Sequence, residues 1–158
     1  MAVDSPEIAR ALHVLAIVVW IGGVAMVTTV LVPAVRRHVK NGEQVEFFER
    51  LESRFAAQAR WTTLLAGATG FWLVWQFNLW ARFAETRYWW MHAMVAVWLL
   101  FTLMLFVLEP LFLHRRLLER SRRDPSGTLL LIHRFHWLLL VISLITVFGA
   151  VAGSHGYL

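Results

Sequence analysis

The seven histidines offer the clearest chemistry in this chain of 158 residues, which contains no cysteine. Without thiols, neither a disulfide nor a thiolate metal site can form. Imidazole remains as a ligand for haem iron, copper or another transition metal, and as a group that titrates near neutral pH. We therefore first ask where the histidines lie and which elements position them.

Those elements are expected to be membrane helices. The chain is 59% hydrophobic, with nine Trp and eleven Phe, which is too apolar for a small soluble domain. Crossing a ~30 Å hydrocarbon core takes ~20 apolar residues, and in lipid only a helix can satisfy the backbone of one such segment. The sequence thus predicts an all-α integral membrane four-helix bundle, in one domain covering residues 1–158. The expected spans are 10–35, 60–80, 88–113 and 129–153. An amphipathic cytoplasmic segment is expected at 43–58, either lying at the inner interface or running into the second span.

The net charge of +5 is unevenly distributed and predicts the orientation. Most basic residues follow the first and third spans, whereas Arg10, Arg82 and Arg87 lie on the opposite side. The positive-inside rule then places both basic segments in the cytoplasm and both termini in the periplasm of a bacterial inner membrane. The first apolar stretch lacks a basic n-region and is expected to remain as a span. Nucleic-acid binding is not expected, because no basic domain lies outside the membrane.

Three histidines, His13, His92 and His155, fall near the outer ends of the first, third and fourth spans. They are either amphipathic anchors at the membrane boundary or ligands. In the second interpretation, His13 and His92 face each other and bind haem b iron or a metal, with His155 in reserve. Copper is the alternative ion, since Met91 and Met94 flank His92.

A second candidate site lies toward the inner face. Glu109 is the one acidic residue expected within a span, and an unpaired carboxylate there would be costly. Arg60, Arg134, His133 and His136 are predicted at a comparable depth. The group is either a buried ion pair that fixes helix packing, or a second haem, metal or proton-relay site. The remaining inner histidines are His38 and His114.

Glycines accompany these residues on three of the spans. Gly22 and Gly23 follow Trp20 on the first span, and Gly149 and Gly153 have the small-xxx-small spacing that permits close helix approach. Gly22 and Gly23 serve either packing, which we prefer, or clearance for a macrocycle.

The segment "ALHVLAIVVWIGGV", residues 11–24, resembles the first span of the copper resistance protein D superfamily. It also resembles the haem-containing, membrane-bound protoporphyrinogen oxidases of bacteria. In both families a His is followed about two turns later by Trp and Gly, here His13, Trp20 and Gly22/Gly23. Pro33 and Gly70 continue the oxidase layout. The resemblance implies a four-span protein that binds haem or copper, with these residues around the cofactor.

The chain also departs from the oxidase pattern. The family has a Lys in the third span, where this chain has "WWMHAM", and an Arg followed by Asn-Glu before the last span, where this chain has "HRFHW". We therefore expect a haem b-binding membrane redox protein of unspecified reaction. A copper-binding or copper-transport protein and a non-catalytic accessory subunit are the alternatives. The expected partners are the lipid bilayer, a quinone or porphyrin-like substrate, and further copies or a larger membrane complex.

Overall fold

The chain folds into helices. In a computed structural model, residues 5–156 are described, except for the side chains of residues 112–114, and this part of the chain contains no strand. The predicted all-α class is therefore confirmed.

Four long helical rods account for most of the chain, and two of them are interrupted by π-helix. The first rod comprises α1 (Ser5–Met26), the π-helix η1 (Val27–Leu31) and α2 (Val32–His38). The second is α3 (Gln44–Gln76), which two 3₁₀ segments, η2 (Leu79–Ala84) and η3 (Thr86–Tyr88), connect to the third. The third comprises α4 (Trp89–Leu103), the π-helix η4 (Met104–Leu113) and α5 (His114–Arg123), and the fourth is α6 (Pro125–Ser154).

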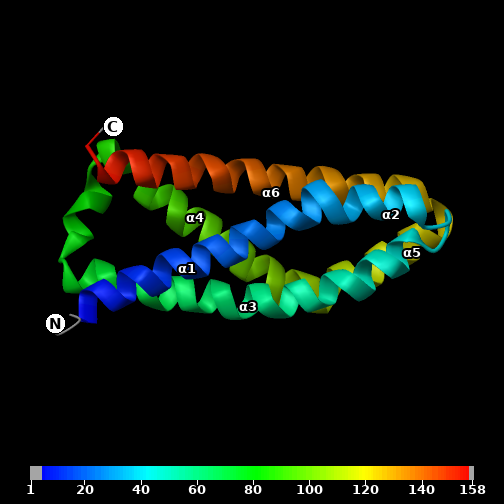
Figure 1. The fold of residues 1–158 in the computed structure, drawn as a ribbon, viewed down its shortest axis with the longest axis horizontal. Coiled ribbons are helices and arrows are strands. Elements are labelled where there is room, and N and C mark those ends of the chain that lie inside the picture. Colours follow the sequence, from blue (N-terminus) through cyan, green and yellow to red (C-terminus); the bar gives the residue numbers. More distant parts are fainter. Residues whose placement is uncertain (1–4, 157–158) are drawn as a thin grey trace.

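The rods pack as two pairs that cross (Figure 1). Helix α1 lies along α3, and α4 lies along α6. The first rod then reaches α6 through η1, while the third reaches α3 through η4 and α5. Helix α1 begins and α6 ends at one end of the molecule, which we call the outer end; α2 and α5 lie at the other, the inner end.

The second rod differs from the predicted span at both ends. The amphipathic segment expected at 43–58 continues without a break into the apolar part of α3. The span predicted at 60–80 ends at Gln76, because Asn78 adopts a left-handed conformation with φ 49° that stops the helix. The first and fourth rods extend beyond their predicted spans at both ends, and the third extends beyond its predicted span at the inner end.

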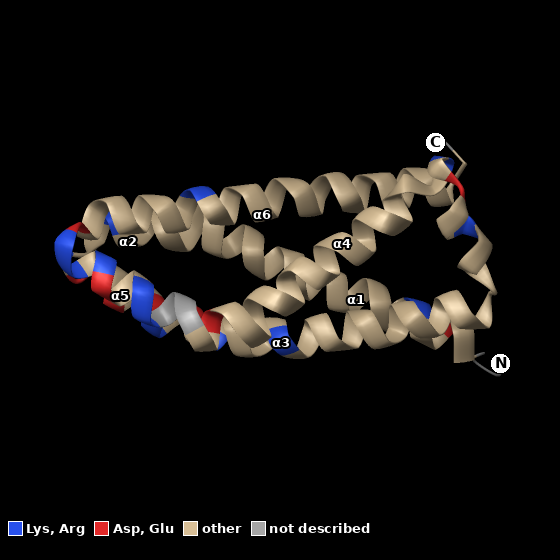
Figure 2. Ribbon diagram, turned by 180° about the vertical axis from the view of Figure 1, so that it is seen from behind, with Lys and Arg blue, Asp and Glu red and all other residues tan. Residues whose placement is uncertain are grey.

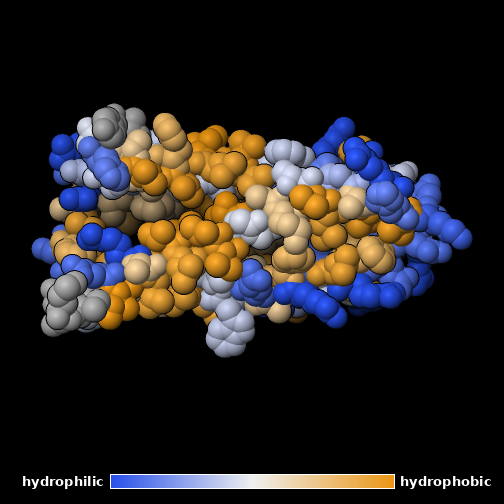
Figure 3. Space-filling model, viewed as in Figure 1, coloured by the Kyte–Doolittle hydropathy of each residue, from blue (hydrophilic) through white to orange (hydrophobic). Residues whose placement is uncertain are grey.

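The surface of the molecule supports a location in a membrane. Three helical segments are long and apolar enough to cross a bilayer, namely Ser5–His38, Thr86–Leu111 and Pro125–Ser154. Large apolar side chains such as Trp75 (69% exposed) and Phe148 (72%) lie open on the outside. Apolar residues dominate the middle of the molecule and polar residues its two ends (Figure 3). Lys and Arg gather around α2 and α5 at the inner end (Figure 2).

Glycines allow aromatic side chains of α4 to pack closely against α3 and α6. A Cβ atom at Gly67 would come within 2.6 Å of the Trp98 ring, and one at Gly153 within 2.5 Å of the Trp90 ring. The packing role predicted for Gly153 agrees with this geometry. Gly149 likewise lies directly against the ring of Trp89.

Candidate functional site

A cavity of about 580 Å³ lies between the four rods, toward the inner end. Its wall includes Trp20 and Gly23 of α1, Glu52 of α3, Glu109 of η4 and His136 of α6. The rest of the wall is mostly apolar and aromatic. Cofactor and small-molecule sites typically have volumes of ~300–1,000 Å³ and such a lining, so this cavity is the candidate functional site.

One side of the site is shaped by Pro110 within η4. In a π-helix each N–H bonds the carbonyl five residues earlier, and proline has no N–H. The carbonyl of Leu105, five residues before Pro110, therefore lacks its donor. The Arg60 Nε atom of α3 donates to this oxygen across 3.0 Å. A side chain from another rod thus replaces the missing backbone donor.

The same device recurs at Pro33 in the first rod. The N–H of Val32 bonds the carbonyl of Val27, so the five-residue register still holds at this point. The next carbonyl, that of Thr28, would be paired with Pro33 and has no donor there. His133 Nε2 of α6 lies 3.0 Å from this oxygen. With its proton on Nε2, the His133 ring donates to Thr28 and connects α6 to η1.

Trp137 also approaches His133. Its Nε1 atom lies 3.1 Å from His133 Nε2, a contact that becomes a hydrogen bond only in the tautomer with Nε2 unprotonated. The freed Thr28 carbonyl favours the other tautomer, because an unsatisfied oxygen within the helical rods is costly. His133 therefore has a structural partner outside the cavity.

The ionisable groups at the inner end of the cavity form a cluster. The Arg60 guanidinium pairs with the Glu109 carboxylate at 3.2 Å, which agrees with the predicted ion pair. Glu52, in the part of α3 before the apolar segment, lies nearby. Burial first, and then the charges of Glu109 and Glu49, raise the pKa of Glu52 to about 7 against the opposing charge of Arg60.

His136 is placed to act as a ligand from the cavity wall. Its Nδ1 donates to the carbonyl of Ile132 across 2.9 Å. That tautomer leaves Nε2 without a proton and therefore able to accept a hydrogen bond or bind a metal. The ring contacts Phe48 edge-on, with centroids 5.9 Å apart. Arg134, grouped with His136 by the sequence, is exposed on the outside of α6.

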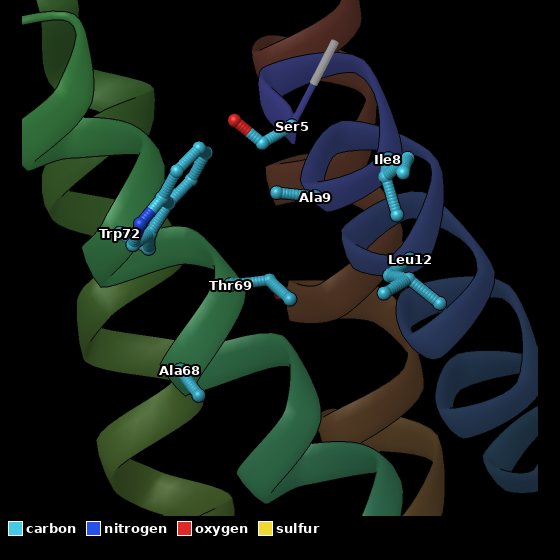
Figure 4. Close-up of a pocket in the computed structure, with 7 residues that line it drawn as sticks. All are labelled: Ser5, Ile8, Ala9, Leu12, Ala68, Thr69 and Trp72. Carbon is cyan, nitrogen blue, oxygen red and sulfur yellow. The ribbon is translucent and has the colours of Figure 1, made fainter. Parts of the chain in front are cut away.

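His13 lies at the outer end and packs against α3. Its Nδ1 lies 2.9 Å from the carbonyl oxygen of Ala66 and 3.1 Å from the hydroxyl of Thr69, and donates to them. Its ring lies against Gly70, where a Cβ would come within 2.9 Å of the imidazole. Thr69 also borders a shallow hollow between α1 and α3, with Trp72 on the opposite side from Ser5, Ala9 and Leu12 (Figure 4).

The other two outer histidines have separate surroundings. His92 is exposed and its ring contacts Phe83 of η2 edge-on, with centroids 5.4 Å apart. His155 is exposed and its Nδ1 donates to the carbonyl of Val151 across 2.8 Å. Among residues 5–156, no hydrogen bond or ring contact joins His13 to His92. The shared haem or metal predicted for this pair therefore stays a prediction.

Of the three residues Trp20, Gly22 and Gly23 of the first span, two line the cavity and one lies on the surface. Trp20 is 5% exposed, contacts Phe101 edge-on at 4.8 Å and lines the cavity. A Cβ at Gly22 or Gly23 would meet no atom within 4 Å, so neither glycine is required for helix contact. Gly23 lines the cavity, which agrees with the clearance role, whereas Gly22 is exposed.

The side-chain positions support a metal-ion site less than they support a site for an apolar ligand. Among the described residues, no three His, Asp or Glu side chains lie close enough together to hold a metal ion. His38 is exposed at the end of α2, and the side chain of His114 lies outside what the structure describes. Comparisons with known protein families, with curated proteins and with solved structures find no match for this chain.

Proposed function

We propose that this chain is a four-span inner-membrane redox protein that binds a flat, hydrophobic ring molecule in the cavity between its rods. In this proposal the apolar part of α3 crosses the membrane together with the three apolar segments named above. Both termini then face the periplasm. Basic residues at the inner end support this orientation. The redox character rests on the family resemblance, and the binding function rests on the cavity.

The observation that carries the proposal is the composition of the cavity wall. Aromatic and aliphatic side chains from all four rods surround a volume of about 580 Å³, and few polar groups reach it. A bound molecule would contact Trp20, Gly23 and His136 together. Such a wall favours a planar apolar ligand with one or two oriented polar atoms.

Haem b is one candidate for this cavity, and His136 favours it. The unprotonated Nε2 of His136 could bind haem iron, and Trp20 and Phe48 would contact the bound ring system. Bound haem would supply one-electron transfer at its iron. The carboxylates of Glu52 and Glu109 fit less well beside the anionic propionates of haem. The case for haem therefore depends on the single imidazole of His136.

An optical spectrum tests the proposal most simply. Protein from haem-replete cells is purified in detergent, and reduced-minus-oxidised spectra, metal content and organic extracts are compared for wild type, His136→Ala and His92→Ala. Haem in the cavity predicts a Soret band that His136→Ala loses and His92→Ala keeps. Wild-type protein carrying neither haem nor an organic ring molecule contradicts the proposal, and stoichiometric copper would favour the copper alternative.

A further inference from the structure

The indole N–H of Trp20 is a hydrogen-bond donor that has no acceptor in the described part of the chain. The side chain is 5% exposed, and its Nε1 is one of two buried side-chain atoms without a hydrogen-bond partner in the described part of the chain. The second, the Thr63 hydroxyl, is not on the cavity wall. A buried N–H without an acceptor destabilises the fold, so Trp20 indicates that an acceptor atom comes from outside the chain.

The remaining polar groups on the wall complement that donor. His136 Nε2 is an acceptor, because Nδ1 holds the proton that bonds Ile132. Glu52 can accept as a carboxylate or donate as an acid, since its pKa is raised to about 7. A ligand that offers both a carbonyl oxygen and, after reduction, a hydroxyl hydrogen would match all three residues.

Charge at the inner end selects against anions. Glu52 and Glu109 border the cavity, and Arg60, the cation that acts on Glu52, is paired with Glu109. An anionic group would meet carboxylates in a medium of low dielectric constant, which is unfavourable. The ligand is therefore expected to be neutral.

The cavity also has a route to the hydrocarbon region. Val19 and Leu131 belong to its wall and are 36% and 45% exposed, so the wall is not closed off by protein at these two residues. In a bilayer this part of the surface faces acyl chains. A ligand with a long apolar tail can thus place its head group in the cavity and leave its tail in the lipid.

We propose that the cavity binds the head group of a membrane quinone, with Trp20 Nε1 donating to a quinone carbonyl. This inference rests on the proposed function and names its substrate class. In the reduced form the quinol hydroxyls donate to His136 Nε2 and to the Glu52 carboxylate. Both oxidation states therefore find partners on the same wall, and neither carries a charge.

Quinone retention by the protein in lipid nanodiscs tests the inference. Quinone-free nanodiscs are incubated with decylubiquinone and separated, and the retained quinone is quantified against empty nanodiscs. Trp20→Phe keeps an aromatic side chain but removes the indole N–H, so the apparent Kd should rise about tenfold. Trp61→Phe is the matched control, since Trp61 is 77% exposed, and its affinity should not change.

Stability separates loss of binding from loss of fold. Trp20→Phe removes a donor that has no partner in the protein, so its melting temperature without quinone should equal or exceed that of wild type. Unchanged quinone affinity in Trp20→Phe, or no retention by wild type above empty nanodiscs, would overturn the quinone inference.

A cavity-filling variant distinguishes the two proposals. If decylubiquinone is not retained, but purified wild type carries a haem or another ring molecule that Gly23→Phe lacks, the quinone assignment is wrong and the proposed function stands. If Gly23→Phe changes neither the retention of decylubiquinone nor the amount of any co-purified molecule, the quinone inference and the proposed function are both wrong.

Discussion

Arg60 Nε donates a hydrogen bond across 3.0 Å to the main-chain oxygen of Leu105, the carbonyl that Pro110 leaves without a backbone donor. His133 stands in the same relation to Thr28 and Pro33. Pro33 and Pro110, in the inner halves of two rods, thus free two carbonyls, and each carbonyl accepts a hydrogen bond from a side chain of another rod.

Loss of Arg60 should destabilise the fold. Arg60→Ala leaves the Leu105 carbonyl without a donor and Glu109 without its cation, at an expected cost of about 2–4 kcal/mol in the free energy of unfolding. The control is Arg50→Ala, whose pair with Glu46 is exposed and contributes less than about 1 kcal/mol. Unfolding in detergent, followed by circular dichroism, measures both.

The proline explanation makes a separate prediction about coupling. Pro110→Ala restores an N–H that can bond Leu105, so Arg60→Gln should cost about 1 kcal/mol less in the Pro110→Ala background than in wild type. A double-mutant cycle on unfolding free energies measures this coupling. Additive effects of the two substitutions would show that Arg60 does not replace the missing backbone donor.

Glu52 predicts how stability depends on pH. Its folded-state pKa is raised from 4.5 to about 7, so between these values the folded protein holds a proton that the unfolded chain has released. Stability should therefore fall as pH rises from about 4.5 to 7, by about 1–2 kcal/mol after allowance for the partial exposure of the side chain. Glu52→Gln should flatten this dependence, whereas the exposed Glu46→Gln should not. Melting curves from pH 4 to 8 measure the difference.

The glycines of α6 should tolerate substitution poorly. A Cβ at Gly153 would come within 2.5 Å of the Trp90 ring, so Gly153→Ala is expected to destabilise the α4–α6 pair by about 1–3 kcal/mol. Gly22→Ala is the control, because a Cβ there meets nothing and alanine favours helix. Equal melting temperatures for Gly153→Ala and wild type would contradict the close packing.

The long apolar stretches and the clustered arginines were sufficient to predict the helices and the gathering of basic residues at one end. Helix ends were less accurate, because single residues such as Asn78 decide them. The predicted depth of Glu109 and Arg60 in the membrane was enough to predict that these two residues approach each other. Depth could not show which way a ring faces, so His13 was expected to face the third span, whereas its contacts lie on α3.

Some features of the site were missed although the sequence contained a signal. Glu52 was assigned to an amphipathic surface, but α3 brings it to the cavity. Pro33 was considered as part of the oxidase layout, and the carbonyls that Pro33 and Pro110 free were overlooked. The sequence could not show that the indole N–H of Trp20 is unpaired, because this depends on which acceptor atoms the fold places near it.

Occupancy of the cavity in Gly23→Phe and Gly22→Phe tests the central claim most directly. A Cβ atom at either position would meet no atom within 4 Å, but only Gly23 lines the cavity. Each variant is purified in native lipid nanodiscs, and bound haem and quinone are quantified per protein. We predict that Gly23→Phe loses the bound ring molecule while Gly22→Phe retains it as wild type does. Equal occupancy in both variants would contradict a ligand site between the rods.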